Sequence, residues 1–123
     1  MTCKALNKHI VWSKRHLNLP GIKIKLPGIT ESDKADIAFA VGMWTDFIAL
    51  SFVRNKENIL DLKKYLLEIN APKWIQIISK IENKEALDNL DEIIWASHWI
   101  MIARWDLWAE IAYETLPIVQ RMI

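Results

Sequence analysis

The stretch from residue 75 to residue 110 constrains the fold most, because it reads as a strand, a helix and a second strand in succession. Apolar and polar residues alternate from Ile75 to Glu82, which indicates a strand with two unlike faces. Leucines and isoleucines then recur at helical spacing, and Asn83 is suited to cap that helix. A helical crossover of this length forces the two strands that it joins to lie parallel. Their carboxyl ends therefore meet at one edge of a sheet.

Charged residues are expected at both of those strand ends. Lys80 and Glu82 share one face of the first strand, because residues two apart in a strand point the same way. The second strand is expected to run into residues 104–107, which places Asp106 at the same edge. A lone lysine and glutamate in this spacing would usually form a surface ion pair of little energetic value. The second carboxylate at matching depth favours a binding or catalytic site instead.

Composition excludes several classes of protein. The chain has 123 residues, enough for one small domain with its own core. Its 16 basic and 15 acidic residues give a net charge of +1, so no nucleic-acid partner is expected. No apolar run approaches the roughly 18 residues of a membrane span. Cys3 is the single cysteine, and without a signal peptide the chain is expected in a reducing cytoplasm.

The rest of the chain repeats the strand and helix unit. Strands are expected at 22–26 and 46–52, and helices at about 31–43, 55–70 and 109–122. No glycine-rich phosphate loop follows the first strand, which disfavours a doubly wound nucleotide-binding sheet. Parallel strands with alternating helices instead predict an α/β fold, an incomplete (β/α)8 TIM-barrel segment.

A barrel segment also predicts how the chain is divided and where its site lies. Residues 1–20 are expected to be the end of an inserted subdomain and its return into the barrel, and residues 21–123 the partial barrel. A whole barrel takes about 250 residues, so roughly half of one is expected, with its outer strands as open edges. Active sites of such barrels lie at the carboxyl ends of the strands, where Lys80, Glu82 and Asp106 are predicted.

Several stretches of the sequence resemble the pyruvate kinase family, in the family's order and almost from end to end. These stretches are residues 17–21, 46–54, 79–83, 90–94, 101–107 and 116–120. The resemblance implies an enzyme of glycolysis that transfers a phosphoryl group between phosphoenolpyruvate and ADP, giving pyruvate and ATP. It also implies that full-length members are homo-oligomers, typically tetramers.

The same resemblance implies a role for each candidate residue. Lys80 would be catalytic and would stabilise the enolate-like transition state, while Glu82 and Asp106 would hold Mg²⁺ or Mn²⁺. The backbone N–H groups of Trp105 and Asp106 would receive the substrate carboxylate, and Arg15 would reach the nucleotide. The residue types suit this chemistry, because magnesium takes few protein carboxylates and a fixed cation stabilises charge on an enolate oxygen. The family also requires K⁺, whose site is expected outside this chain.

Tryptophan is abundant in this sequence and glycine is scarce. There are seven tryptophans and three glycines, whereas average usage of about 7% predicts roughly nine glycines. The resemblance implies glycine at Trp12, Trp44, Trp99, Trp105 and Trp108. The departure at Trp105 is the most severe, because an indole there is expected to fill a pocket where the backbone approaches the substrate. One hypothesis is that all seven tryptophan codons are UGA and encode glycine in the organism. The other is a decayed or engineered copy.

Three functions stay open on the sequence. The first is a segment of pyruvate kinase, inactive as this isolated chain. The second is a metal-dependent aldolase or lyase on a similar barrel, which also acts through an enolate; residues 17–21 and 79–83 favour the kinase over it. The third is a non-catalytic fragment that only associates through exposed sheet edges, which should bind neither magnesium nor phosphoenolpyruvate.

Overall fold

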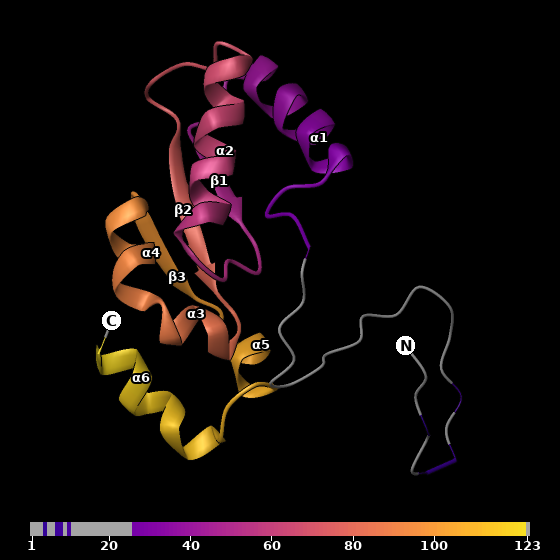
Figure 1. Cartoon of the computed structure of the whole chain (residues 1–123), viewed down its shortest axis with the longest axis vertical. Helices are drawn as coiled ribbons and strands as arrows, with labels where there is room; N and C mark the ends of the chain where they lie inside the picture. The colour runs from indigo at the N-terminus through magenta and orange to yellow at the C-terminus, as the bar shows by residue number, and fades with distance from the viewer. Residues whose placement is uncertain (1–3, 5–6, 9, 11–25, 123) are drawn as a thin grey trace.

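Three parallel strands form one sheet in the order β1-β2-β3 (Figure 1). The computed structural model describes residues 4, 7–8, 10 and 26–122. The strands are β1 (Phe47–Leu50), β2 (Gln76–Ile81) and β3 (Trp99–Ile102). The helices are α1 (Glu31–Gly42), α2 (Lys56–Glu68), α3 (Lys84–Asp88), α4 (Leu90–Ala96), α5 (Arg104–Trp108) and α6 (Leu116–Met122), with a 3-10 turn η1 (Tyr113–Thr115) before α6. The subdomain expected over residues 1–20 and the strand expected at 22–26 fall almost wholly outside the described residues.

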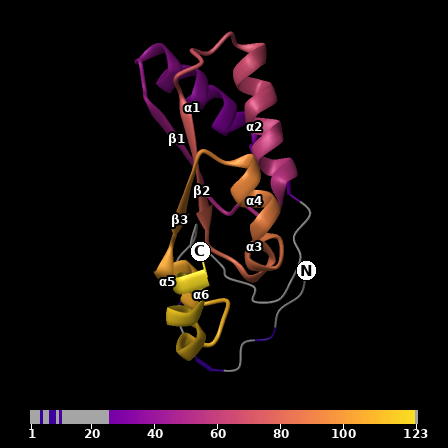
Figure 2. The ribbon, with the colours of Figure 1, turned by 90° about the vertical axis from the view of Figure 1, so that its left-hand side faces the viewer.

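Helices α2, α3 and α4 lie together on one face of the sheet (Figure 2). The central strand β2 alternates accordingly, with Ile77, Ser79 and Ile81 buried and the residues between them half-buried. The buried core consists of Ile29, Ile37, Leu50, Val53, Ile59, Leu62, Ile77, Ile81, Ala86 and Ile93. Parallel strands that alternate with helices covering one face are the arrangement predicted from the sequence.

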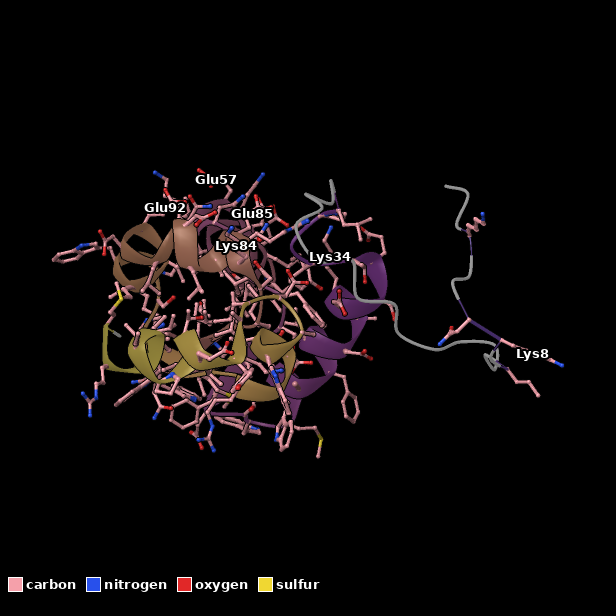
Figure 3. The ribbon with its side chains drawn as sticks, turned by 90° about the horizontal axis from the view of Figure 1, so that it is seen from below. Lys8, Lys34, Glu57, Lys84, Glu85 and Glu92 are labelled. Carbon is pink, nitrogen blue, oxygen red and sulfur yellow. The ribbon has the colours of Figure 1, made fainter. Side chains whose placement is uncertain are left out.

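The outer side of these helices is charged. Lys84, Glu85, Glu57 and Glu92 gather along the surface of α2, α3 and α4 (Figure 3). Glu92 also lies against the start of α2, where its Oε1 accepts a hydrogen bond of 3.1 Å from the N–H of Lys56. No helix within the described part of the chain is long and apolar enough to cross a membrane. The helices thus have one face packed on the sheet and one face in water.

Helix α1 begins at a capping box. The Asp33 N–H donates to the Thr30 hydroxyl at 3.2 Å, and the Thr30 N–H donates to the Asp33 carboxylate at 2.7 Å. The backbone hydrogen bond from Thr30, with a further one from its hydroxyl, holds the pKa of Asp33 below its usual value. The box satisfies two N–H groups at the start of α1.

Helix α1 ends in a turn that requires a left-handed residue. The Thr45 N–H donates to the Ala40 carbonyl at 3.3 Å and the Trp44 N–H to the Val41 carbonyl at 3.1 Å, which is the bond pair of a Schellman motif. Trp44 occupies the left-handed position of this motif, with φ at 61°. Glycine is the usual residue there, because a Cβ atom is strained in that conformation. The Trp44 ring stacks on Trp74, with ring centroids 5.8 Å apart.

Four element boundaries differ from the sequence-based expectations. The helix expected over 109–122 is the 3-10 turn η1 followed by α6, which begins only at Leu116. Strand β1 ends at Leu50, because Phe52 adopts a left-handed conformation (φ 51°) and turns the chain. The single helix expected after β2 is two helices, since Asn89 interrupts it with φ −112° and ψ 21°. Strand β3 ends at Ile102, and residues 104–108 form helix α5 where the sequence analysis placed a strand. That last difference moves Asp106 from a strand end to the first turn of a helix.

Candidate active site

The predicted site lies at the carboxyl edge of the sheet, where α5 follows β3 (Figure 1). The Ala103 N–H donates to the Ile81 carbonyl at 3.1 Å and closes the pairing of β2 with β3. Glu82 follows Ile81 directly, and Asp106 lies in the first turn of the helix that begins after Ala103. Both carboxylates therefore belong to the same edge, as the parallel arrangement predicted, although Asp106 is carried by a helix.

Lys80 and Glu82 form a close ion pair at this edge. The Lys80 Nζ lies 2.6 Å from Oε1 of Glu82, and the two side chains are 25% and 1% exposed. Lys80 also donates to the Ser51 hydroxyl at 3.1 Å. A carboxylate as buried as Glu82 loses its hydration, so it requires a compensating charge and hydrogen bonds. The pair is therefore not a weakly stabilising contact on an exposed surface.

The second oxygen of Glu82 is held by the turn that follows β1. Its Oε2 accepts a hydrogen bond of 2.6 Å from the N–H of Phe52. The left-handed conformation of Phe52 is costly for a residue with a side chain, and such strain often occurs at functional sites. Asn83 fixes the same turn by donating from Nδ2 to the Val53 carbonyl at 3.0 Å, and Val53 is fully buried. The ends of β1 and β2 are thus tied together around the Glu82 carboxylate.

Ser51 and Phe52 are site residues that the sequence analysis missed. It placed both in the strand that ends in the structure at Leu50. Their partners, Lys80 and Glu82, lie about 30 positions along the chain, so no local pattern reports these bonds. The available signal was topological: Ser51 and Phe52 directly follow a parallel strand next to the one that carries Lys80, at the same edge.

Helix α5 places the other candidate residues on an exposed surface. Asp106 is exposed and lies in the first turn of α5, where a negative charge is favourable. The first hydrogen bond of the helix runs from the Leu107 N–H to the Ala103 carbonyl at 3.0 Å. The N–H groups of Trp105 and Asp106 come before it in the chain, among the first N–H groups of a helix, which have no acceptor within the helix. The Trp105 side chain is 80% exposed, and its ring lies 5.5 Å from that of Trp108. Arg15, predicted to reach the nucleotide, lies outside the described residues.

The carboxylates of this edge suit a hard divalent cation. In the described part of the chain, no three His, Cys, Asp or Glu side chains converge on a space that a metal could fill. Magnesium is typically bound by only one or two protein carboxylates, with water and substrate oxygens at its other positions. The Lys80 ammonium stands 2.6 Å from Oε1 of Glu82, so this oxygen already binds a cation in the structure. The donor chemistry of Glu82 and of Asp106, a carboxylate in each case, is of the kind that magnesium or manganese takes.

Known proteins resemble this chain along its whole length. A family model described as "Pyruvate kinase, barrel domain" matches residues 1–123. The pyruvate kinase of Geobacillus stearothermophilus is 46% identical over 118 residues, which is 96% of this chain and 20% of that protein. The enzyme of Staphylococcus saprophyticus is 47% identical over 119 residues, which is 97% of this chain and 20% of that protein. The enzyme of Clostridium acetobutylicum is 42% identical over 121 residues, which is 98% of this chain and 25% of that protein.

These relatives confirm two predictions from the sequence, the family and the barrel fold of parallel strands and alternating helices. The chain spans about a fifth of the length of the first two of these relatives, at 20% of each. The three strands of the described residues, and the Lys80–Glu82 pair at their edge, therefore lie within the region that the barrel-domain model matches. The chain is a member of the pyruvate kinase family and corresponds to part of its barrel domain.

Proposed function

We propose that this chain supplies part of the active site of a pyruvate kinase, which transfers a phosphoryl group between phosphoenolpyruvate and ADP to give pyruvate and ATP in glycolysis. The observation that supports this most is the buried Glu82 carboxylate paired with Lys80 at the carboxyl edge of a parallel sheet. A barrel enzyme places its chemistry at this edge. The aldolase or lyase alternative loses its support, because the relatives named above are pyruvate kinases.

Each residue of the edge has a part in this proposal. Glu82 and Asp106 hold Mg²⁺ or Mn²⁺, and the ion, when bound, neutralises charge on the phosphoryl and enolate oxygens. The Lys80 ammonium stabilises the negative charge that develops on the enolate oxygen as the phosphoryl group leaves. The N–H groups of Trp105 and Asp106 bind the substrate carboxylate at the start of α5.

Other parts of the enzyme complete the site. Arg15 reaches the nucleotide, and K⁺ is bound by residues outside this chain. The full enzyme is a cytoplasmic homo-oligomer, typically a tetramer. On this proposal the isolated chain does not turn over its substrates, because most of the barrel and of the nucleotide site is absent from it. Turnover by the purified chain above a Lys80→Ala control would show that this part of the proposal is wrong.

The metal assignment can be tested on the chain itself with Mn²⁺, whose binding is measured by the loss of its free-ion electron paramagnetic resonance signal. We expect the chain to bind Mn²⁺ and the Glu82→Gln and Asp106→Asn variants to bind at least tenfold more weakly, since a missing ligand should cost no less than the roughly 10–100-fold cost of a missing outer-shell partner. Asp91→Asn is the matched control, because Asp91 is an exposed carboxylate on the neighbouring helix α4. Equal binding by all variants, or no binding by the chain, would contradict the assignment.

A further inference from the structure

The Lys80 ammonium occupies the position on Glu82 that the proposed metal requires. Oε2 of Glu82 is held by the Phe52 N–H at 2.6 Å, so Oε1 is the oxygen left for a cation. Lys80 lies 2.6 Å from Oε1. The Glu82 side chain is only 1% exposed, whereas Lys80 is 25% exposed, so the ammonium is the more accessible partner of the pair. A metal that binds Oε1 therefore has to displace the ammonium from this oxygen.

We propose that Lys80 and the divalent cation exchange places on Glu82. This inference rests on the proposed function. Without metal, the ammonium binds Oε1; when a divalent cation binds there, Lys80 leaves that oxygen and is available to the substrate. Two cations on one oxygen repel each other strongly at such short range, which is the physical reason for the exchange. The lysine stem is flexible, so the ammonium can move while the buried carboxylate stays fixed.

Ser51 is the positioning residue of this exchange. Its hydroxyl accepts from Lys80 Nζ at 3.1 Å, and it follows β1 at the same edge as the ion pair. After Lys80 leaves Oε1, the Ser51 hydroxyl can keep one hydrogen bond to the ammonium and hold it beside the metal. The turn after β1 therefore serves both groups: Phe52 fixes the carboxylate and Ser51 retains the lysine.

The first test compares Mn²⁺ affinity between the chain and its Lys80→Gln variant. Glutamine keeps a donor near Glu82 but removes the competing charge. We therefore expect the variant to bind Mn²⁺ about tenfold more tightly, which corresponds to about 1.4 kcal/mol of binding free energy. Lys84→Gln is the control, because Lys84 is an exposed lysine two residues beyond Glu82 and forms no ion pair among the described residues. Equal affinities of the chain and Lys80→Gln, or an equal gain in the control, would overturn the exchange.

A second measurement follows Lys80 itself. Mass spectrometry after brief acetylation should show more modification of Lys80 when Mn²⁺ is present, because the ammonium has left the carboxylate. The Ser51→Ala variant keeps the ion pair, so it should fold, and we expect its Lys80 to be acetylated more than that of the unchanged chain when the metal is bound, because the ammonium then lacks the hydroxyl that retains it. Unchanged labelling of Lys80 with Mn²⁺ still bound at Glu82 would refute the exchange while leaving the metal assignment intact. Absence of Mn²⁺ binding would refute the metal assignment instead.

A second inference comes from the tryptophans. The six that the structure describes are all at least half-exposed, at 75% for Trp44, 50% for Trp74, 89% for Trp95, 57% for Trp99, 80% for Trp105 and 52% for Trp108. Tryptophan is ordinarily among the most buried residues on average. Trp44 also occupies the left-handed position of a Schellman motif, at φ 61°. We infer that the fold is built for glycine at position 44, and that the organism reads this codon as glycine.

The decisive experiment is mass spectrometry of the peptide that contains residue 44, taken from the protein made in its own organism. We expect glycine at this position, and tryptophan there would overturn the inference about the codon. The backbone argument has its own test in the recombinant chain. Trp44→Gly should raise the midpoint of thermal unfolding by about 2–8 °C, because it relieves the left-handed strain. Trp95→Gly, inside the right-handed helix α4, should lower it, and a rise in both would contradict the backbone argument.

Discussion

Replacing Lys80 with methionine will lower the free energy of unfolding by about 3–5 kcal/mol, because the change leaves a buried carboxylate without its counter-charge. The Glu82 side chain is 1% exposed and would keep only the hydrogen bond from the Phe52 N–H. Urea unfolding of both proteins, followed by circular dichroism, measures the difference.

The opposite substitution is the informative control. Glu82→Gln removes the buried charge and leaves Lys80, which is 25% exposed and can turn toward water. Its cost should therefore be smaller, about 1–3 kcal/mol for the hydrogen bonds that it disturbs. The double variant should resemble Glu82→Gln alone, since no buried charge is left. If Lys80→Met lowers the free energy of unfolding no more than Glu82→Gln does, the burial of Glu82 is not what makes the ion pair stabilising.

The order of strands and helices is predictable from this sequence because it rests on local patterns. The alternation from Ile75 to Glu82 gives β2 its two faces, and the side chain of Asn83 caps the next helix by accepting from the Ala86 N–H at 2.8 Å. The left-handed turn at Phe52 is not predictable in this way, because phenylalanine seldom adopts that conformation. The surrounding bonds of the turn, and not the residue's own preference, decide where β1 ends.

The charged residues of the candidate site could be predicted from the sequence, whereas the hydrogen bonds that hold them in place could not. Lys80 and Glu82 follow from period-two spacing, and the edge that they share with Asp106 follows from parallel strands. The sequence did not reveal that Asp106 sits on a helix, because the short apolar run before it gives no signal for where a strand should stop. The hydrogen bonds of Ser51 and Phe52 join residues about 30 positions apart, so only the folded chain shows them.

Leu107→Ala will have the largest effect on the Asp106 side of the site. Leu107 is the one buried residue of α5 and is 0% exposed, so alanine should lower the free energy of unfolding by about 2–5 kcal/mol. A helix of five residues has little stability of its own and depends on such packing. Because α5 carries Asp106, we expect Mn²⁺ affinity to fall toward that of Asp106→Asn although no ligand is changed. Manganese titration and urea unfolding of the same variant measure both effects.

Arg104→Ala is the matched control, because Arg104 is an exposed residue of the same helix and its loss should change stability by no more than about 0.5 kcal/mol. The comparison separates two accounts of the metal site. If Leu107→Ala weakens Mn²⁺ binding and Arg104→Ala does not, the anchored helix positions Asp106 on the metal. The contrary result would be a Leu107→Ala variant that loses less stability than expected and keeps full Mn²⁺ affinity. In that case the packing of α5 does not position Asp106 on the metal, and Glu82 must hold the ion with other partners.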